Sequence, residues 1–175
     1  MENYPRLAQD SDKKVVLNFC QNTFLWGDYI HEVWDNWIDE GNLIVIDNNQ
    51  VPISMTHAAF YPDEKMIWIE GIRVDKNFRK NGVAQKMIFY LEETAKSKKC
   101  EISRMLIASE NKPSLSLAKK LGYTIISKWN YFSLESKSIH EEINITSDSC
   151  IDSIDNLNEK NFHFIESWRW IPLTD

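Results

Sequence analysis

The sequence lacks the features that mark membrane, secreted and nucleic-acid-binding proteins. No apolar run approaches the roughly 20 residues that a helix needs to cross a bilayer. The N-terminal segment M-E-N-Y-P-R-L-A-Q-D has no basic stretch followed by an apolar one, as a secretory signal would have. Basic residues are outnumbered, 20 against 26 acidic ones for a net charge of −6, and they form no extended stripe. We therefore expect a soluble, cytoplasmic protein that binds neither membrane nor nucleic acid.

Cysteine is also scarce. The three cysteines are widely separated and none lies in a C-x-x-C pair, and the four histidines do not cluster along the chain. This spacing supports neither a disulfide framework nor a zinc site. We predict no bound metal.

Large apolar side chains are plentiful, with seven Trp, eight Phe and six Tyr in 175 residues. They suffice for one domain with a sizeable core. Periodicity and turn residues predict, in order, a short strand at 4–8, helices at 10–20 and 27–41, strands at 43–47, 51–60 and 66–74, a helix after Gly82, a strand at 104–109, a helix at 113–121, and a strand or bent hairpin at 123–134. The predicted fold class is α/β, with a mixed sheet whose first half is mainly antiparallel.

The chain changes character after Glu135. Residues 136–142 are polar, whereas residues 162–171 are rich in aromatic side chains. We expect one domain over residues 1–135 and a C-terminal extension over residues 136–175. The extension either packs on the core or continues into a further domain.

The stretch from Met66 to Ala84 carries the most specific signal. The segment M-I-W-I-E-G-I-R-V is apolar on both faces, as in a buried central strand, and strict alternation places Glu70 on the face of Trp68, Ile72 and Val74. The turn R-K-N-G-V-A follows and opens an amphipathic helix. A helix start presents free backbone N–H groups, and a glycine there lets a phosphate approach closely. We predict an anion-binding turn rather than a plain entry into a helix.

The same residues resemble the GNAT superfamily of N-acetyltransferases. Arg79-x-x-Gly82-x-Ala84 matches the family's (Q/R)-x-x-G-x-(G/A) signature for the pyrophosphate of acyl-CoA, with Val74 at the expected end of the preceding strand. The resemblance is strongest over residues 43–134. It implies a GNAT-like acyl-CoA N-acyltransferase fold, with acetyl-CoA as cosubstrate.

A second stretch resembles the family's N-x-x-A-x-x-L-Y-x-K-x-G-F signature, from Asn111 and Ser114 to Lys120-Leu121-Gly122-Tyr123. The resemblance then implies three groups of acetyl-CoA-binding residues. They are the strand backbone for pantetheine (Ile72, Arg73, Val74), the turn for the pyrophosphate (Arg79, Lys80, Asn81, Gly82, Val83, Ala84) and an opposite wall (Asn111, Ser114). From the residues alone, Asn111 also fits a helix cap before Pro113.

An amine acceptor must lose a proton before it attacks an acyl group, which requires a base. Glu70 is the candidate, because it lies four positions before Val74, where some GNAT members carry a glutamate that acts directly or through water. The alternative is a structural glutamate, paired with Arg73 or bonded to nearby backbone.

One position departs from the family pattern. Where GNAT members usually carry a tyrosine that protonates the leaving thiolate, this chain has Ala118. Tyr123 or Tyr131 could substitute, or the thiolate leaves unassisted, since a thiol pKa of about 8.5 makes it a tolerable leaving group.

The second predicted helix is strongly acidic, with Asp28, Glu32, Asp35, Asp39 and Glu40 and no Lys or Arg among them. A solvated helix face explains this pattern, but the resemblance places the helix beside the acceptor entrance, where it would attract cationic amines. The tryptophans of this region, at 26, 34 and 37, fit a core better than a stacking site.

The sequence thus predicts an enzyme that transfers acetyl from acetyl-CoA to a primary amine, by direct attack in a ternary complex. The acceptor is a small molecule or a peptide amine. Two alternatives stay open: a protein N-terminal or lysine acetyltransferase, and a CoA-binding module without catalysis.

Overall fold

The computed structural model describes residues 4–21, 23–24, 27–129, 163–166 and 169–172. Within them helices pack on a mixed sheet, and the predicted α/β class is confirmed. The elements are β1 (Pro5–Leu7), η1 (Asp10–Asp12), α1 (Lys13–Cys20), α2 (Ile30–Glu40), β2 (Leu43–Asn48), β3 (Val51–Tyr61), β4 (Met66–Val74), η2 (Lys76–Phe78), α3 (Val83–Ser97), β5 (Ile102–Arg104), α4 (Lys112–Lys120), β6 (His163–Glu166) and β7 (Arg169–Pro172).

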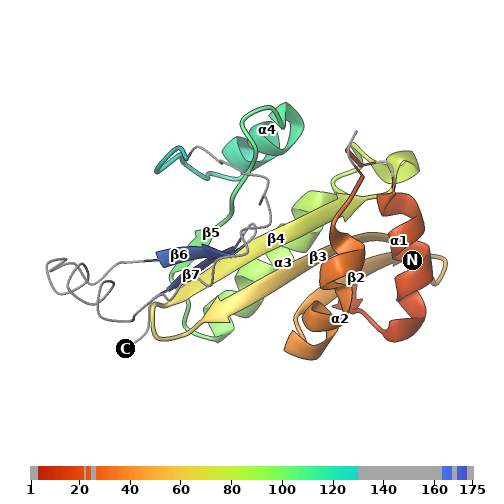
Figure 1. Ribbon diagram of the computed structural model, residues 1–175, viewed down its shortest axis with the longest axis horizontal. Coiled ribbons are helices and arrows are strands. Elements are labelled where there is room, and N and C mark those ends of the chain that lie inside the picture. The colour runs from red at the N-terminus through yellow and green to blue at the C-terminus, as the bar shows by residue number, and fades with distance from the viewer. Residues whose placement is uncertain (1–3, 22, 25–26, 130–162, 167–168, 173–175) are drawn as a thin grey trace, which may run out of the picture.

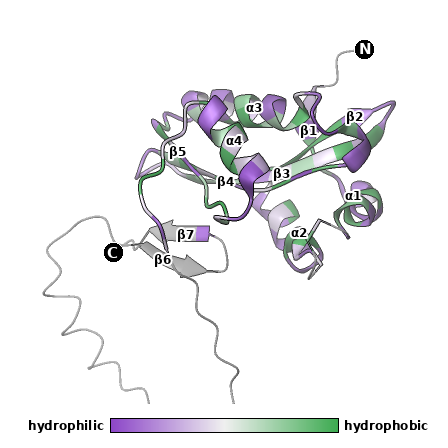
Figure 2. Ribbon diagram, turned by 90° about the horizontal axis from the view of Figure 1, so that it is seen from above, coloured by the Kyte–Doolittle hydropathy of each residue, from purple (hydrophilic) through white to green (hydrophobic). Residues whose placement is uncertain are grey.

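The first five strands form one sheet in the order β1-β2-β3-β4-β5. Its pairs are antiparallel except for β4 with β5, which run parallel because α3 carries the chain back between them. The helix α3 covers one face of the sheet, and α1 and α2 cover the other (Figure 2). We call these the α3 face and the α2 face.

Apolar side chains fill both faces. On the α3 face, one side of α3 meets the inward residues of β2 to β4 in a cluster made by Met87, Ile88, Leu91, Ala95, Ile44, Ile46, Ile53, Ala58, Ile67 and Ile69. On the α2 face, Trp34 and Trp37 are buried with Val16, Ile30 and Met55. The prediction that these two tryptophans belong to the core is confirmed, while Trp26 lies outside the described residues.

The helix α2 ends where its sequence predicted, but it begins at Ile30 rather than at residue 27. It ends at Gly41, whose φ of +77° is the left-handed conformation of a helix C-terminus. At its start, Asp28 Oδ1 accepts a hydrogen bond from the Ile30 N–H at 3.2 Å. The acidic helix is therefore held at both ends.

A β-bulge in β4 corrects the predicted faces of this strand. Met55 pairs with Arg73 but His57 pairs with Glu70, so two residues of β4, Gly71 and Ile72, stand opposite one residue of β3. Gly71 takes φ +63°, and a Cβ there would come within 2.5 Å of the Trp37 ring. The extra residue reverses the alternation, so that Ile72 and Val74 pack on the α3 face.

Glu70 consequently does not share a face with Ile72 and Val74, and that prediction was wrong. The side chain of Glu70 points to the α2 face, where it meets His57 on the Trp37 ring. The glycine was visible in the sequence, but the bulge depends on how closely α2 packs against it.

The strand predicted at 104–109 was also misplaced. β5 covers Ile102–Arg104, and residues 105–109 form no strand. Met105 nevertheless packs against the α3-face cluster, so its apolar character reflects burial rather than strand pairing. Residues 123–129 form no strand either, and 130–134 lie outside the described residues.

β6 and β7 form a separate two-stranded antiparallel sheet, and β7 lies beside β4 (Figure 1). This hairpin lies in the segment predicted as a C-terminal extension. No helix of the described residues has the length and apolar character of a membrane span.

Candidate active site

The parallel strands β4 and β5 separate partway along the sheet. They pair only from Met66 opposite Ile102 to Trp68 opposite Arg104. Beyond Trp68, β4 continues to Val74 while the chain after Arg104 turns away toward α4. The second half of β4, with Ile72, Arg73 and Val74, therefore has its backbone edge turned to the opening, as pantetheine pairing would require.

The predicted anion-binding turn leads from the end of β4 into α3. Gly82 is the N-cap of α3, with φ +76°, and Lys80 before it also has a positive φ of 65°. A Cβ on Gly82 would meet nothing within 4 Å, so the space in front of the helix start is open. Residues 79–82 are exposed, and Arg79 folds back so that its Nε donates to the Val74 carbonyl at 3.0 Å.

The predicted opposite wall lies on α4, where Asn111 is the N-cap. Its Oδ1 accepts a hydrogen bond from the Ser114 N–H at 3.2 Å. The capping role that the residues alone allowed is confirmed. Contact of Asn111 and Ser114 with a ligand stays a prediction.

Ala118, which replaces the family's usual tyrosine, is buried on α4. The alternative acid Tyr123 donates its hydroxyl to Glu92 Oε1 at 2.6 Å. Burial and this hydrogen bond raise the pKa of Tyr123 above its ordinary value. The phenol is thus a weaker acid than usual and already has an acceptor, while Tyr131 lies outside the described residues.

Glu70, the candidate base, is almost fully enclosed, with its side chain 7% exposed. His57 lies directly opposite on β3, and its Nδ1 is 2.9 Å from Glu70 Oε1. The imidazole is 0% exposed and stacks on the Trp37 indole, with centroids 4.7 Å apart and planes at 8°. Its Nε2 is 3.3 Å from Glu40 Oε2, but without hydrogen-bond geometry, so Nε2 has no hydrogen-bond partner among the described residues.

Arg169, the first residue of β7, completes this cluster from far along the chain. Its Nε donates to Glu70 Oε1 at 2.9 Å, its Nη2 donates to the same oxygen, and its Nη1 donates to Glu40 Oε1 at 3.0 Å. Burial works against the charge, but the hydrogen bonds to Glu70 and Glu40 outweigh it and raise the pKa of Arg169 above the ordinary value. The guanidinium therefore stays charged between two carboxylates.

Tyr61 lies next to the same guanidinium. Burial, together with the carboxylates of Glu70 and Glu40, raises the pKa of its phenol, while Arg169 acts in the opposite direction. We call Glu40, His57, Tyr61, Glu70 and Arg169 the Glu70 cluster. It joins residues of α2, β3, β4 and β7 on the α2 face.

The alternative partner for Glu70, Arg73, is engaged elsewhere. Its Nε and Nη2 donate to the two carboxylate oxygens of Asp28 at 2.6 and 3.0 Å, and its guanidinium lies over the rings of Phe24 and Tyr29. The pairing of Glu70 with Arg73 was therefore wrong. The bulge explains this, because it turns Arg73 toward the loop before α2.

The acidic residues in α2 and just before it lie in different environments. Asp28 is buried against Arg73, Asp35 bonds Lys13 Nζ at 2.6 Å, and Glu40 reaches the Glu70 cluster. Asp39 is exposed. A uniformly solvated face is thus too simple a description, since two of the five carboxylates bond arginines.

Sequence reasoning missed His57, although a signal for it existed. The Tyr61–Met66 pair closes the β3–β4 hairpin, and counting back from it places residue 57 opposite residue 70. Arg169 had no such signal, because it lies 99 residues from Glu70 and its strand was not predicted.

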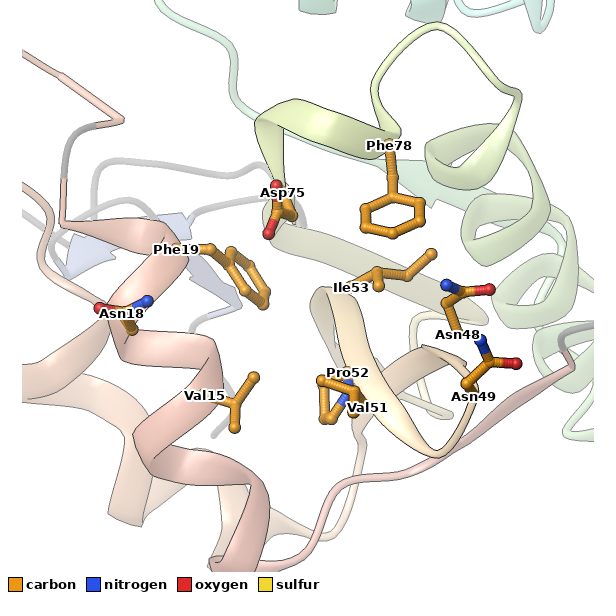
Figure 3. A pocket seen from close by; sticks show the side chains of 10 residues that line it. All are labelled: Val15, Asn18, Phe19, Asn48, Asn49, Val51, Pro52, Ile53, Asp75 and Phe78. Carbon is orange, nitrogen blue, oxygen red and sulfur yellow. The ribbon is translucent and has the colours of Figure 1, made fainter.

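A cavity of about 340 Å³ lies away from these residues, between α1, the β2–β3 turn and η2 (Figure 3). Phe19 lies across it from Phe78 and Ile53, and Asp75 lies at its edge. The Asp75 carboxylate accepts from the Asn77 N–H at 2.8 Å and so caps η2. None of the predicted site residues lines this cavity, and we assign it no role.

The model of the acetyltransferase (GNAT) family matches residues 15–123 of this chain. The match covers both signatures, the opening between β4 and β5, and Glu70, and it ends before Arg169. No curated protein matches the sequence.

Solved structures share the fold. A transcriptional regulator from Bacillus halodurans C-125 is 17% identical with a TM-score of 0.65, over 76% of this chain and 100% of that one. The aminoglycoside antibiotic 6'-N-acetyltransferase AAC(6')-IG from Acinetobacter haemolyticus is 22% identical with a TM-score of 0.59, over 78% and 100%. AAC(6')-Iy in complex with the bisubstrate analogue CoA-S-monomethyl-acetylneamine is 16% identical with a TM-score of 0.62, over 78% and 100%.

Proposed function

The chain belongs to the GNAT family of acetyltransferases, and from this premise we propose that it transfers acetyl from acetyl-CoA to a primary amine in a ternary complex. The proposal rests on the arrangement of two features on one strand, β4. It holds a buried carboxylate at Glu70 and, two to four residues later, the backbone edge that faces the opening beside β5. The base Glu70 and the thioester of acetyl-CoA would then lie close together at the β4 bulge.

The residues present fit acetyl-CoA. Gly82 leaves open space before the start of α3, where N–H groups and the positive end of the helix dipole favour a phosphate. The backbone of Ile72, Arg73 and Val74 would hold the pantetheine arm, and the exposed Arg79, Lys80 and Asn81 would border the pyrophosphate with Val83 and Ala84. When bound, acetyl-CoA would supply the acetyl group as a thioester.

Glu70 would accept the proton that the acceptor ammonium must lose before its nitrogen can attack. Every hydrogen bond to its carboxylate within the described residues reaches Oε1, from His57 or Arg169, which leaves Oε2 as the oxygen available to an amine or a water. Since Tyr123 is bonded to Glu92, we propose that it does not act as the acid, so that the thiolate leaves unassisted or is protonated by Tyr131. The structural similarity to two aminoglycoside acetyltransferases supports a polar amine acceptor.

Thermal unfolding with acetyl-CoA tests the binding half of the proposal. Acetyl-CoA should raise the melting temperature, and Gly82→Val should remove most of that rise, because its side chain would fill the space that the phosphate needs. Gly41→Val is the matched control, since Gly41 has nearly the same φ and open surroundings but lies at the end of α2. Equal acetyl-CoA shifts in the two variants would show that the turn is not the phosphate site.

An amine panel that follows release of free thiol tests the catalytic half. Turnover on small amines supports the proposal, while turnover confined to peptides would favour a protein N-terminal or lysine acetyltransferase. Binding of CoA without turnover on any amine would favour the non-catalytic module, for which Ala118 is the specific argument.

A further inference from the structure

In the Glu70 cluster, two carboxylates from the family domain hold a cation that comes from outside that domain. Glu40, His57 and Glu70 lie within residues 15–123, which match the acetyltransferase family, whereas Arg169 lies on the C-terminal hairpin. The acidic part of the cluster is thus built by the family domain alone. The charge that neutralises it is delivered by a separate element.

The contacts of Arg169 leave the acidic groups incompletely bonded. It reaches Glu70 through Oε1 and Glu40 through Oε1, so neither carboxylate receives the paired bonds of a fork-to-fork contact. The buried Nε2 of His57 also has no hydrogen-bond partner within the described residues. A guanidinium is therefore accommodated here, but the site is not closed around it.

The hairpin that carries Arg169 is not part of the five-stranded sheet. β6 and β7 pair with each other and with no other strand in the described part of the chain, and a lone two-stranded hairpin is marginally stable in water. Without Arg169, the nearby carboxylates of Glu40 and Glu70, at 37% and 7% exposed, would lack a counter-charge. Such a partly buried acidic pair favours any cation that can take the same place.

We infer that Glu40, Glu70 and His57 form the subsite for the ammonium group of the acceptor, and that Arg169 occupies this subsite in competition with it. The inference rests on the proposed function, because it identifies the acceptor's binding group as the ammonium that Glu70 deprotonates. The substrate class is then an amine that is protonated when it binds. The C-terminal hairpin sets the apparent affinity for this amine without taking part in the chemistry.

Steady-state kinetics of Arg169→Ala test the competition in the full-length protein. The KM for an amine that the wild type acetylates should fall by roughly five-fold, which is the change expected if Arg169 occupies the subsite about four-fifths of the time. The KM for acetyl-CoA should stay constant. Methylguanidinium, which mimics the arginine head, should inhibit this variant competitively against the amine and not against acetyl-CoA.

Binding measurements separate this inference from the proposed function. Methylguanidinium at about 20 mM should raise the melting temperature of Arg169→Ala by about 2–4 °C. It should raise the melting temperatures of the wild type and of Arg169→Ala/Glu40→Gln much less. If this shift appears but no variant acetylates any amine, the proposed function fails and the cation subsite stands. If amines are acetylated but KM is unchanged or higher in Arg169→Ala and methylguanidinium does not compete, the subsite is overturned and the function stands.

Two controls exclude a purely structural role for Arg169. Arg6→Ala removes another arginine that bridges two carboxylates, Asp12 and Asp47, at the β1 edge of the sheet. It should lower the melting temperature without changing the KM for the amine. Arg169→Lys keeps the cation and should resemble the wild type. A KM that falls equally in Arg6→Ala would overturn the inference.

Discussion

Two arginines in this protein each lie between two carboxylates, yet their bonding differs. Arg6 uses three nitrogens to reach all four oxygens of Asp12 and Asp47, over distances of 2.7 to 3.0 Å. Arg169 also uses three nitrogens, but they reach one oxygen of Glu70 and one of Glu40. The two clusters contain the same charges, one arginine and two carboxylates. We call the Arg6 cluster closed, because all four carboxylate oxygens are bonded, and the Arg169 cluster open, because only two are.

The difference follows from what each arginine connects. Arg6 ties β1 to the neighbouring strand β2 and to η1, and Asp12 Oδ2 also accepts from the Gln9 N–H at 2.9 Å, so geometry can be optimised locally. Arg169 comes from a hairpin outside the five-stranded sheet and bonds Glu70, on the strand that borders the proposed acyl-donor opening. Saturated oxygens indicate a structural role, whereas unsaturated oxygens beside an opening leave room for a ligand.

The largest loss of stability should come from breaking a third pair, Arg73 with Asp28, which is a buried structural contact. Their side chains are 10% and 3% exposed. Asp28→Asn should cost about 3 kcal/mol of unfolding free energy, because it leaves the Arg73 charge buried without a counter-charge. Urea unfolding measures the loss, and the double variant Asp28→Asn/Arg73→Met should recover part of it. A loss below that of Arg6→Ala would contradict the ranking of these clusters.

The next effect is catalytic. Glu70→Gln should lower kcat by roughly 10²-fold at neutral pH if Glu70 is the base, with a smaller loss at higher pH as more of the amine is already free. The variant keeps one oxygen for His57 and Arg169, so the fold should change little. pH–rate profiles of both proteins decide the matter. An unchanged profile would make Glu70 a structural partner of Arg169.

The closed cluster makes a pH-dependent contribution to stability. Burial favours the neutral form of Asp12, but hydrogen bonds from Arg6 and the Gln9 N–H outweigh it and lower the pKa of Asp12. A lowered folded pKa means that the stabilisation is present above the unfolded value of about 3.9 and is lost as pH falls through the folded value. Asp12→Asn should therefore cost about 1–2 kcal/mol near pH 7 and progressively less below about pH 4. Melting curves across this range would contradict the assignment if the difference were constant.

Local rules predicted most elements of this fold, although they misplaced the strand at 104–109, and they failed where distant residues meet. The helix α2 ends at Gly41 and α3 starts at Gly82, as turn chemistry and periodicity indicated, because both signals are contained in a few neighbouring residues. The bulge at Gly71 depends on the approach of Trp37 from α2, and it reversed the predicted face of Ile72 and Val74. Strand alternation alone contains no information about that contact.

The candidate site shows the same division. Family signatures placed Glu70 and the turn 79–84 on the right elements, and the hairpin register would have added His57. The partners Glu40 and Arg169 come from α2 and β7, and no local sequence pattern around either residue predicts its place in the cluster of Glu70. Charge patterning marked α2 as acidic but did not distinguish which of its carboxylates faces the site.

The smallest effect distinguishes among the acidic residues of α2 and so sharpens the contrast between open and closed contacts. Glu40→Gln should raise the KM for a cationic amine about three-fold, because Glu40 is one of the two carboxylates of the proposed ammonium subsite, while the double variant Asp35→Asn/Asp39→Asn should leave it nearly unchanged. Asp35 is bonded to Lys13 and Asp39 is exposed, and charges farther than about 8 Å from the amine are largely screened at physiological ionic strength. Kinetics at two salt concentrations test this. If instead the double variant gave the larger rise in KM, and that rise faded with salt, the whole acidic face of α2 would attract the acceptor and Glu40 would have no special place in the subsite.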